Sequence, residues 1–97
     1  MTHILPAEPD LVGQWFIKDG HVVADEMCRR IESLIENYLD ELGHDATGWD
    51  VLYRDPKDGR LWELTYPQSD MHGGGPPRLT LVSIDKANRK YTNLQIE

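Results

Sequence analysis

The sequence has one cysteine, no long apolar run and fewer basic than acidic residues. A lone cysteine, Cys28, excludes a disulfide within the chain. No run of about 18 apolar residues occurs, and residues 1–10 lack the basic start and apolar core of a signal peptide, so we expect a cytoplasmic location and no membrane binding. A net charge of -7 disfavours nucleic acid as a partner, because its phosphates would be repelled.

The acidic excess lies in the first half of the chain. Residues up to Asp50 include eleven acidic and three basic side chains, whereas those from Val51 onward include six acidic and seven basic ones. This asymmetry favours a basic partner, or serves solubility alone. The 97 residues, 39% of them hydrophobic, suit a single domain spanning 1–97 with one modest core and with residues 1–10 as an extended lead-in.

The segment from Gly48 to Ser83 predicts a β-hairpin, a loop and a third strand. Residues 55–59, Asp-Pro-Lys-Asp-Gly, have the composition of a tight turn, since Pro fixes φ, Asp accepts from nearby amides and Gly allows positive φ. With this turn, alternation places one apolar set of side chains on a single face. The pairs on that face are Tyr53 with Trp62, Val51 with Leu64, and Trp49 with Tyr66. The pairs on the other face are Arg54 with Leu61, Leu52 with Glu63, and Asp50 with Thr65.

Residues 25–42 have the pattern of one amphipathic helix. Asp25 offers an acceptor to the free amides of a helix start, and Gly43 provides a stop. The apolar positions have the spacing of a single helical face. They are Met27, Ile31, Leu34, Ile35, Tyr38, Leu39 and Leu42. We expect this helix to cover the apolar face of the hairpin.

The remaining elements complete an α+β fold. Residues 11–18 predict a strand, Asp19-Gly20 a two-residue turn, and residues 21–23 a returning strand. Residues 78–83 predict a further strand, followed by a short helix over 85–90 capped by Ser83 or Asp85. The expected fold is an antiparallel sheet of four to five strands with one long helix and a short C-terminal helix on one face.

Two long phrases resemble the immunity protein 27 family. They are LVGQWFIKDGHVVADEMCRRIESLI, which begins at Leu11, and LYRDPKDGRLWELTYPQSDMHGGGPP, which begins at Leu52. The likeness extends roughly from Leu11 to Tyr91. It implies a small α+β protein that is encoded beside a polymorphic bacterial toxin and neutralises it. The family supplies no catalytic or ligand motif, so the candidate binding residues below come from the sequence itself.

An acidic row, Glu32, Glu36 and Asp40, has a spacing of four residues within the predicted helix. Such residues share one stripe of a helix, where like charges repel by a few tenths of a kcal/mol per pair. The row is either a solvated outer face, partly balanced by Arg29, or a docking surface for a basic partner. Toxins of such systems are often nucleases with cationic clefts, which carboxylates would complement.

The loop over residues 68–77 contains three glycines followed by two prolines. It lacks the Lys-Ser/Thr pair of a phosphate-binding loop, so that interpretation is rejected. The loop is either a structural connection or a recognition loop, in which Asp70, Met71 and His72 would contact a partner. Glu63 faces away from the aromatic side of the hairpin, either on a plain exposed face or on a second binding surface.

No metal, cofactor or catalytic set is predicted. The four histidines lack the spacing of a metal site, and Cys28 is expected to be a buried or half-buried thiol rather than a nucleophile. We expect a non-enzymatic immunity protein that binds a cognate, basic toxin domain. Two alternatives stay open: a small enzyme that reverses a toxin's modification, with His72, Asp70 and Cys28 as its polar groups, and an interaction adaptor with an unrelated partner.

Overall fold

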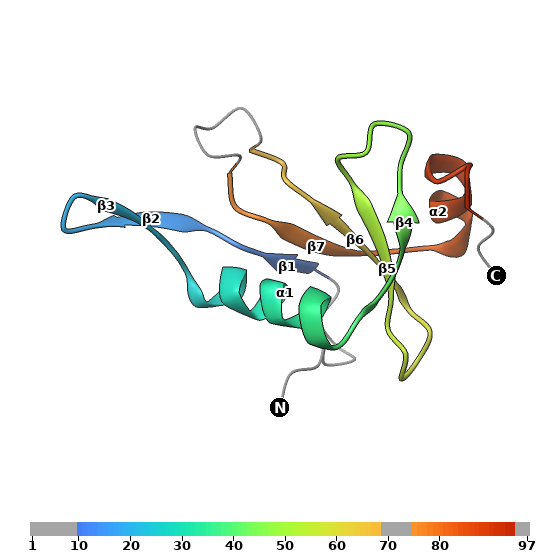
Figure 1. Ribbon diagram of the computed structural model, residues 1–97, viewed down its shortest axis with the longest axis horizontal. Helices are drawn as coiled ribbons and strands as arrows, with labels where there is room; N and C mark the ends of the chain where they lie inside the picture. Colours follow the sequence, from blue (N-terminus) through green and yellow to red (C-terminus); the bar gives the residue numbers. More distant parts are fainter. Residues whose placement is uncertain (1–9, 69–74, 95–97) are drawn as a thin grey trace.

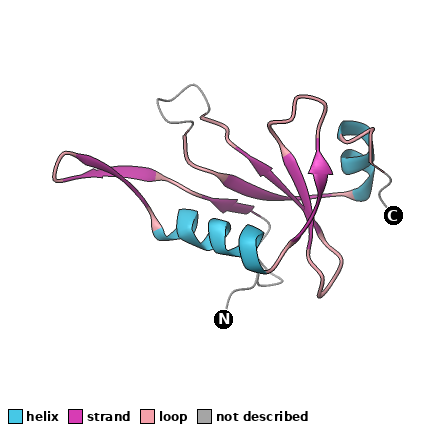
Figure 2. Cartoon of the chain, viewed as in Figure 1, coloured by secondary structure: helices cyan, strands magenta, loops and turns pink. Residues whose placement is uncertain are grey.

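Seven strands and two helices occur in residues 10–68 and 75–94, the part of the chain that the computed structural model describes (Figure 1). In chain order they are β1 (Asp10–Val12), β2 (Trp15–Lys18), β3 (His21–Ala24), α1 (Glu26–Asn37), β4 (Asp40–His44), β5 (Val51–Arg54), β6 (Leu61–Thr65), β7 (Arg78–Val82) and α2 (Ile84–Lys90). Five strands form an antiparallel sheet in the order β1-β7-β6-β5-β4, while β2 and β3 form a separate ribbon (Figure 2). The predicted α+β class is confirmed.

The hairpin of β5 and β6 has the register that alternation predicts. Val51 lies opposite Leu64, and Tyr53 lies opposite Trp62. The turn before β6 forms as expected, because Asp55 Oδ1 accepts from the Lys57 amide at 2.8 Å and Gly59 adopts a φ of 78°. The third predicted strand is also present as β7, which pairs with β6.

The two helices cover opposite faces of the five-stranded sheet. Ile31 and Leu34 of α1 pack with Trp62 in one cluster of buried residues, whereas Tyr91, at the end of α2, packs with Leu52 in another. Neighbouring residues of a strand point to opposite faces, as Leu52 and Tyr53 do here. The long helix therefore covers the aromatic face as expected, while the short helix lies on the other face rather than beside it.

The helix α1 begins where predicted but ends five residues early. Asp25 caps it by accepting from the Cys28 amide at 2.9 Å, and the amides of Tyr38 and Leu39 both donate to the Leu34 carbonyl at its end. Leu39 then packs on the α1 side of the sheet and Leu42 on the α2 side. One helical face cannot reach both sides, so the chain continues as strand β4. The prediction that the helix extends to Leu42 is wrong.

The predicted strand over residues 11–18 is divided into β1 and β2. The Gly13 amide donates to the Pro77 carbonyl at 2.9 Å, and the Gln14 carbonyl accepts from the Asp25 amide at 3.0 Å. These bonds join the break to two other segments, and β2 leaves the five-stranded sheet there. The predicted turn at Asp19-Gly20 is confirmed, with Lys18 paired to His21 across it. No helix in the described part of the chain has the length and apolar character needed to cross a bilayer.

Candidate functional site

The acidic row is divided between a helix and a strand. Glu32 and Glu36 are exposed on α1, on the side that helical periodicity places opposite the buried Ile31 and Leu34. Asp40 is exposed too, but it begins β4, where it lies opposite Arg54 of β5. The prediction that all three form one helical stripe is therefore wrong. The two helical carboxylates remain available to a partner, while Asp40 also faces a positive side chain within the sheet.

Glu63 is buried beneath α2, with 5% of its surface exposed. Its carboxylate accepts from the Tyr91 hydroxyl at 2.9 Å and pairs with Lys90 Nζ at 2.5 Å, and Lys90 also pairs with Asp50 at 2.6 Å. Burial lowers the pKa of Lys90, but the two carboxylates outweigh burial and hold the pKa above its ordinary value. The expectation of an exposed Glu63 is wrong, because this group attaches α2 to the sheet.

Asp55 is a second buried carboxylate, and no pattern in the sequence predicts its burial. Besides its turn hydrogen bond it accepts from the Tyr38 hydroxyl at 2.7 Å, which joins the end of α1 to the turn between β5 and β6. This hydrogen bond, together with burial, raises the pKa of Tyr38 to about 12. Arg60 lies 3.7 Å from the same carboxylate. Asp55 thus stabilises the fold and is not part of an exposed binding surface.

Trp49 is 75% exposed, whereas Trp62, the other tryptophan of the predicted apolar face, is fully buried. The loop before β5 explains the difference. Asp45 Oδ1 accepts from the Gly48 amide at 3.1 Å and the Thr47 hydroxyl at 2.7 Å, and Thr47 Oγ1 accepts from the Trp49 amide. These bonds hold Trp49 in a turn, so β5 begins at Val51. The prediction that Trp49 belongs to the covered face is wrong.

Cys28 is a buried thiol, as expected. Its Sγ donates to the Gln14 carbonyl at 3.4 Å, and burial, followed by the nearby Asp25 carboxylate, raises its pKa. A raised pKa keeps the thiol protonated and weakly nucleophilic. Among residues 10–68 and 75–94, no cluster of three or more His, Cys, Asp or Glu side chains could hold a metal ion.

The proposed recognition residues Asp70, Met71 and His72 lie outside the described residues. The two ends of their loop are described and lie close together. Gly75 has a φ of 77°, and a Cβ there would collide with the Gln68 carbonyl. Gly75, Pro76 and Pro77 are all buried. The base of the loop is thus closed and anchored against the domain.

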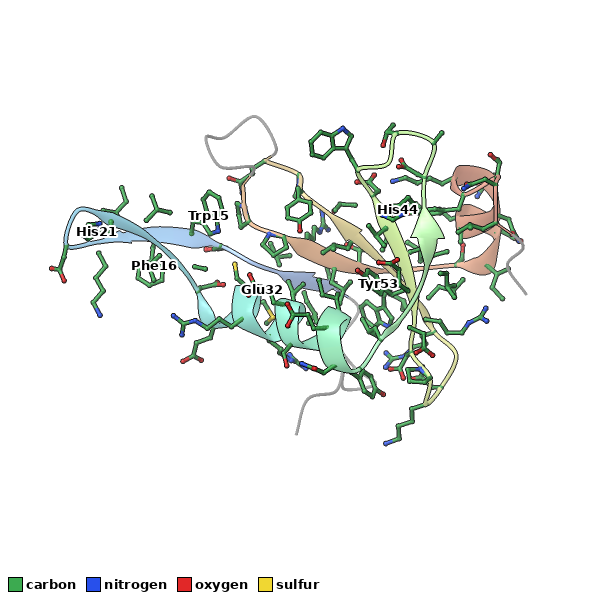
Figure 3. All side chains as sticks on the ribbon, in the orientation of Figure 1. Trp15, Phe16, His21, Glu32, His44 and Tyr53 are labelled. Atoms are coloured by element: carbon green, nitrogen blue, oxygen red, sulfur yellow. The ribbon has the colours of Figure 1, made fainter. Side chains whose placement is uncertain are left out.

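The ribbon of β2 and β3 exposes apolar side chains that sequence reasoning did not single out. Phe16, Ile17 and Val22 are 47%, 76% and 64% exposed. Both strands have apolar residues on both faces, and Figure 3 shows Trp15 and Phe16 on opposite sides of the ribbon. The signal was present in the sequence, because two apolar strands joined by a two-residue turn are followed at once by a helix, which leaves few residues to cover both faces.

Comparison with known proteins gives one informative result. The family model described as immunity protein 27 matches residues 17–83, which is more than half of the chain. The match begins in β2 and ends after β7, so it includes α1 and the central hairpin. No curated protein and no solved structure matches the chain.

Proposed function

The chain belongs to the immunity protein 27 family, and we propose that it neutralises a cognate bacterial toxin domain by binding it in a fixed ratio, without catalysis. The family match carries this proposal. It covers α1 and β3 to β7, which supply most residues of both buried clusters, while Leu11 of β1 and Ala87 and Tyr91 of the α2 region lie outside it. A folded domain of this kind suits inhibition by occlusion, in which one rigid surface covers the toxin's active site or an area beside it.

The charge of the exposed residues supports a basic toxin surface as the partner. Glu32 and Glu36 on α1, and Asp40 on β4, all present carboxylates to solvent. Opposite charges on two partners raise the association rate and favour the correct register. A nuclease domain fits such a partner, because a cleft that attracts phosphates also attracts carboxylates. Asp70, Met71 and His72 stay a predicted second contact, at the loop whose base Gly75 closes.

A titration tests this function. The toxin domain encoded beside the gene would be purified and its activity measured at increasing amounts of the immunity protein. We expect activity to fall linearly and to reach zero at a fixed molar ratio, and we expect co-expression to restore growth and the two chains to co-purify. Protection at far smaller amounts would contradict the proposal and indicate an enzyme, while failure of the chains to co-purify or restore growth would indicate an unrelated adaptor.

A further inference from the structure

The β2–β3 arm, residues 15–24, is a two-stranded ribbon outside the five-stranded sheet. Its strands pair with each other, and Figure 1 shows the ribbon extending past β1 and away from the sheet. Ile17 and Val22 lie directly opposite each other and are its most exposed apolar pair, while Phe16 is half-exposed on the other face. Water-exposed apolar side chains grouped on one projecting element mark an interaction site more often than single scattered ones do.

The base of the arm is fixed to the domain. The Asp25 amide donates to the Gln14 carbonyl at 3.0 Å, which ties the two ends of the arm together where α1 begins. The Cys28 thiol donates to the same carbonyl, and the adjacent Gly13 amide donates to Pro77. An isolated two-stranded ribbon is marginally stable in water, so these bonds hold the arm in a defined direction. A pre-oriented element loses less entropy when it binds.

The charges around the arm indicate which kind of partner binds it. Between Trp15 and Asp50, the chain has nine acidic and three basic residues. The arm leads directly into α1, whose outer side exposes Glu32 and Glu36. A second copy of this chain would bring two such acidic regions together, at a cost in electrostatic repulsion. A basic protein would instead complement the region, so the charge favours a basic partner over self-association.

We propose that the β2–β3 arm inserts its Ile17–Val22 side into an apolar depression on the toxin domain that is bordered by basic side chains. The proposal rests on the proposed function, since it assigns the contact through which the toxin is held. The arm supplies buried apolar area, which slows dissociation, while the neighbouring carboxylates of α1 act on association. Binding would therefore depend on two adjacent surfaces with separable kinetic effects.

The double variant Ile17→Thr/Val22→Thr tests the arm. Threonine keeps the β-branched shape that suits a strand and removes apolar surface. The control is Val12→Thr/Ile84→Thr, which makes the same two changes at exposed positions outside the arm. We expect the arm variant to weaken toxin binding at least about tenfold in calorimetry and the control to stay within about twofold. Stopped-flow kinetics should assign most of this loss to faster dissociation. Thermal unfolding of each variant confirms that the domain is folded.

Hydrogen exchange of the wild-type complex provides a test without substitution. Toxin binding should slow exchange of the amides at residues 15–24. If those amides are not protected, or if the arm variant binds as tightly as wild type, the arm proposal is overturned while the proposed function stands. If the wild-type chain does not bind the toxin at all, both fail. A wild-type dimer that the arm variant converts to a monomer would assign the arm to self-association and also overturn the proposal.

Discussion

At the residue scale, Asp55 and Glu63 show what local sequence patterns can predict and what they cannot. The turn composition predicts the hydrogen bond that Asp55 makes within its turn, and strand alternation predicts the side of the sheet that Glu63 faces. Neither rule predicts burial, because the groups that cover them come from distant segments. Tyr38 is 17 residues from Asp55, and Tyr91 is 28 residues from Glu63. A partner at such a distance leaves no signal near the carboxylate in the sequence.

Glu63→Gln is expected to lower the free energy of unfolding by about 1–3 kcal/mol, because it removes the charge of a buried carboxylate and leaves Lys90 paired with Asp50 alone. The control Glu32→Gln changes an exposed residue and should shift stability by less than about 0.5 kcal/mol. Urea unfolding measures both. Toxin affinity should respond in the opposite order, with Glu32→Gln the more damaging. A Glu63→Gln variant that is fully stable but binds weakly would place Glu63 in the interface.

At the scale of elements, the sequence predicts pairing and helix starts better than helix ends. The register of β5 with β6 follows from alternation and one turn, α1 begins at its expected cap Asp25, and α2 begins at Ser83, one of its two candidate caps. The end of α1 does not follow, because the apolar spacing of residues 38–42 fits a helix as well as a chain that turns into a strand. The choice depends on β5, whose free edge β4 completes. That edge is formed by a later part of the sequence.

Gly43 is a position in β4 at which we expect a substitution to be destabilising. It lies at a shift in the register between β4 and β5, with a φ of 155°, and a Cβ there would lie 2.7 Å from Leu94 Cδ2. Gly43→Ala should therefore destabilise the domain by about 1–3 kcal/mol, measured by thermal unfolding. Gly48→Ala is the control, because Gly48 also has a positive φ but a Cβ there meets no atom within 4 Å.

Combining Gly43→Ala with Leu94→Ala separates the two causes. If the contact with Leu94 contributes, the double variant should lose less stability than the sum of the two single variants. Strict additivity, with Gly43→Ala and Gly48→Ala equally destabilising, would assign the whole effect to the backbone conformation. In both cases, a loss of unfolding free energy above about 1 kcal/mol in Gly43→Ala supports the assignment of residue 43 to a strand. If residue 43 lay at the exposed end of a helix, alanine would stabilise the domain instead.

For the whole molecule, the buried faces of the sheet could be predicted from local patterns, whereas the exposed candidate binding surfaces depend on how distant segments pack. Alternating apolar residues in β5 and β6 contribute to both buried clusters, which is why the fold class could be predicted from sequence. The candidate site was only partly predictable. The exposure of Glu32 and Glu36 follows from helix periodicity, but the projecting arm depends on where β2 leaves the sheet. The burial of Glu63 depends on α2 lying on the face opposite α1.

The acidic side of α1 is expected to act on association more than on dissociation. In Glu32→Lys/Glu36→Lys, attraction to a basic toxin becomes repulsion, so the association rate should fall about tenfold or more at low ionic strength. Added salt screens both effects, so the rates of variant and wild type should converge as the ionic strength rises. Stopped-flow measurement over a series of salt concentrations gives this dependence. Asp40→Lys is tested separately, because Asp40 lies opposite Arg54 within the sheet.

The control for this experiment is Asp58→Lys/Asp85→Lys, which changes the net charge equally but at residues outside the acidic half of the chain. Both residues are exposed, at the β5–β6 turn and in the first turn of α2. If the toxin docks along α1, the control should slow association much less than the α1 variant, because screening limits the reach of a charge to about 10 Å at 0.1 M salt. Equal slowing by both variants would show that net charge alone steers the partner. An unchanged rate in the α1 variant would make Glu32 and Glu36 a solvated face with no part in binding.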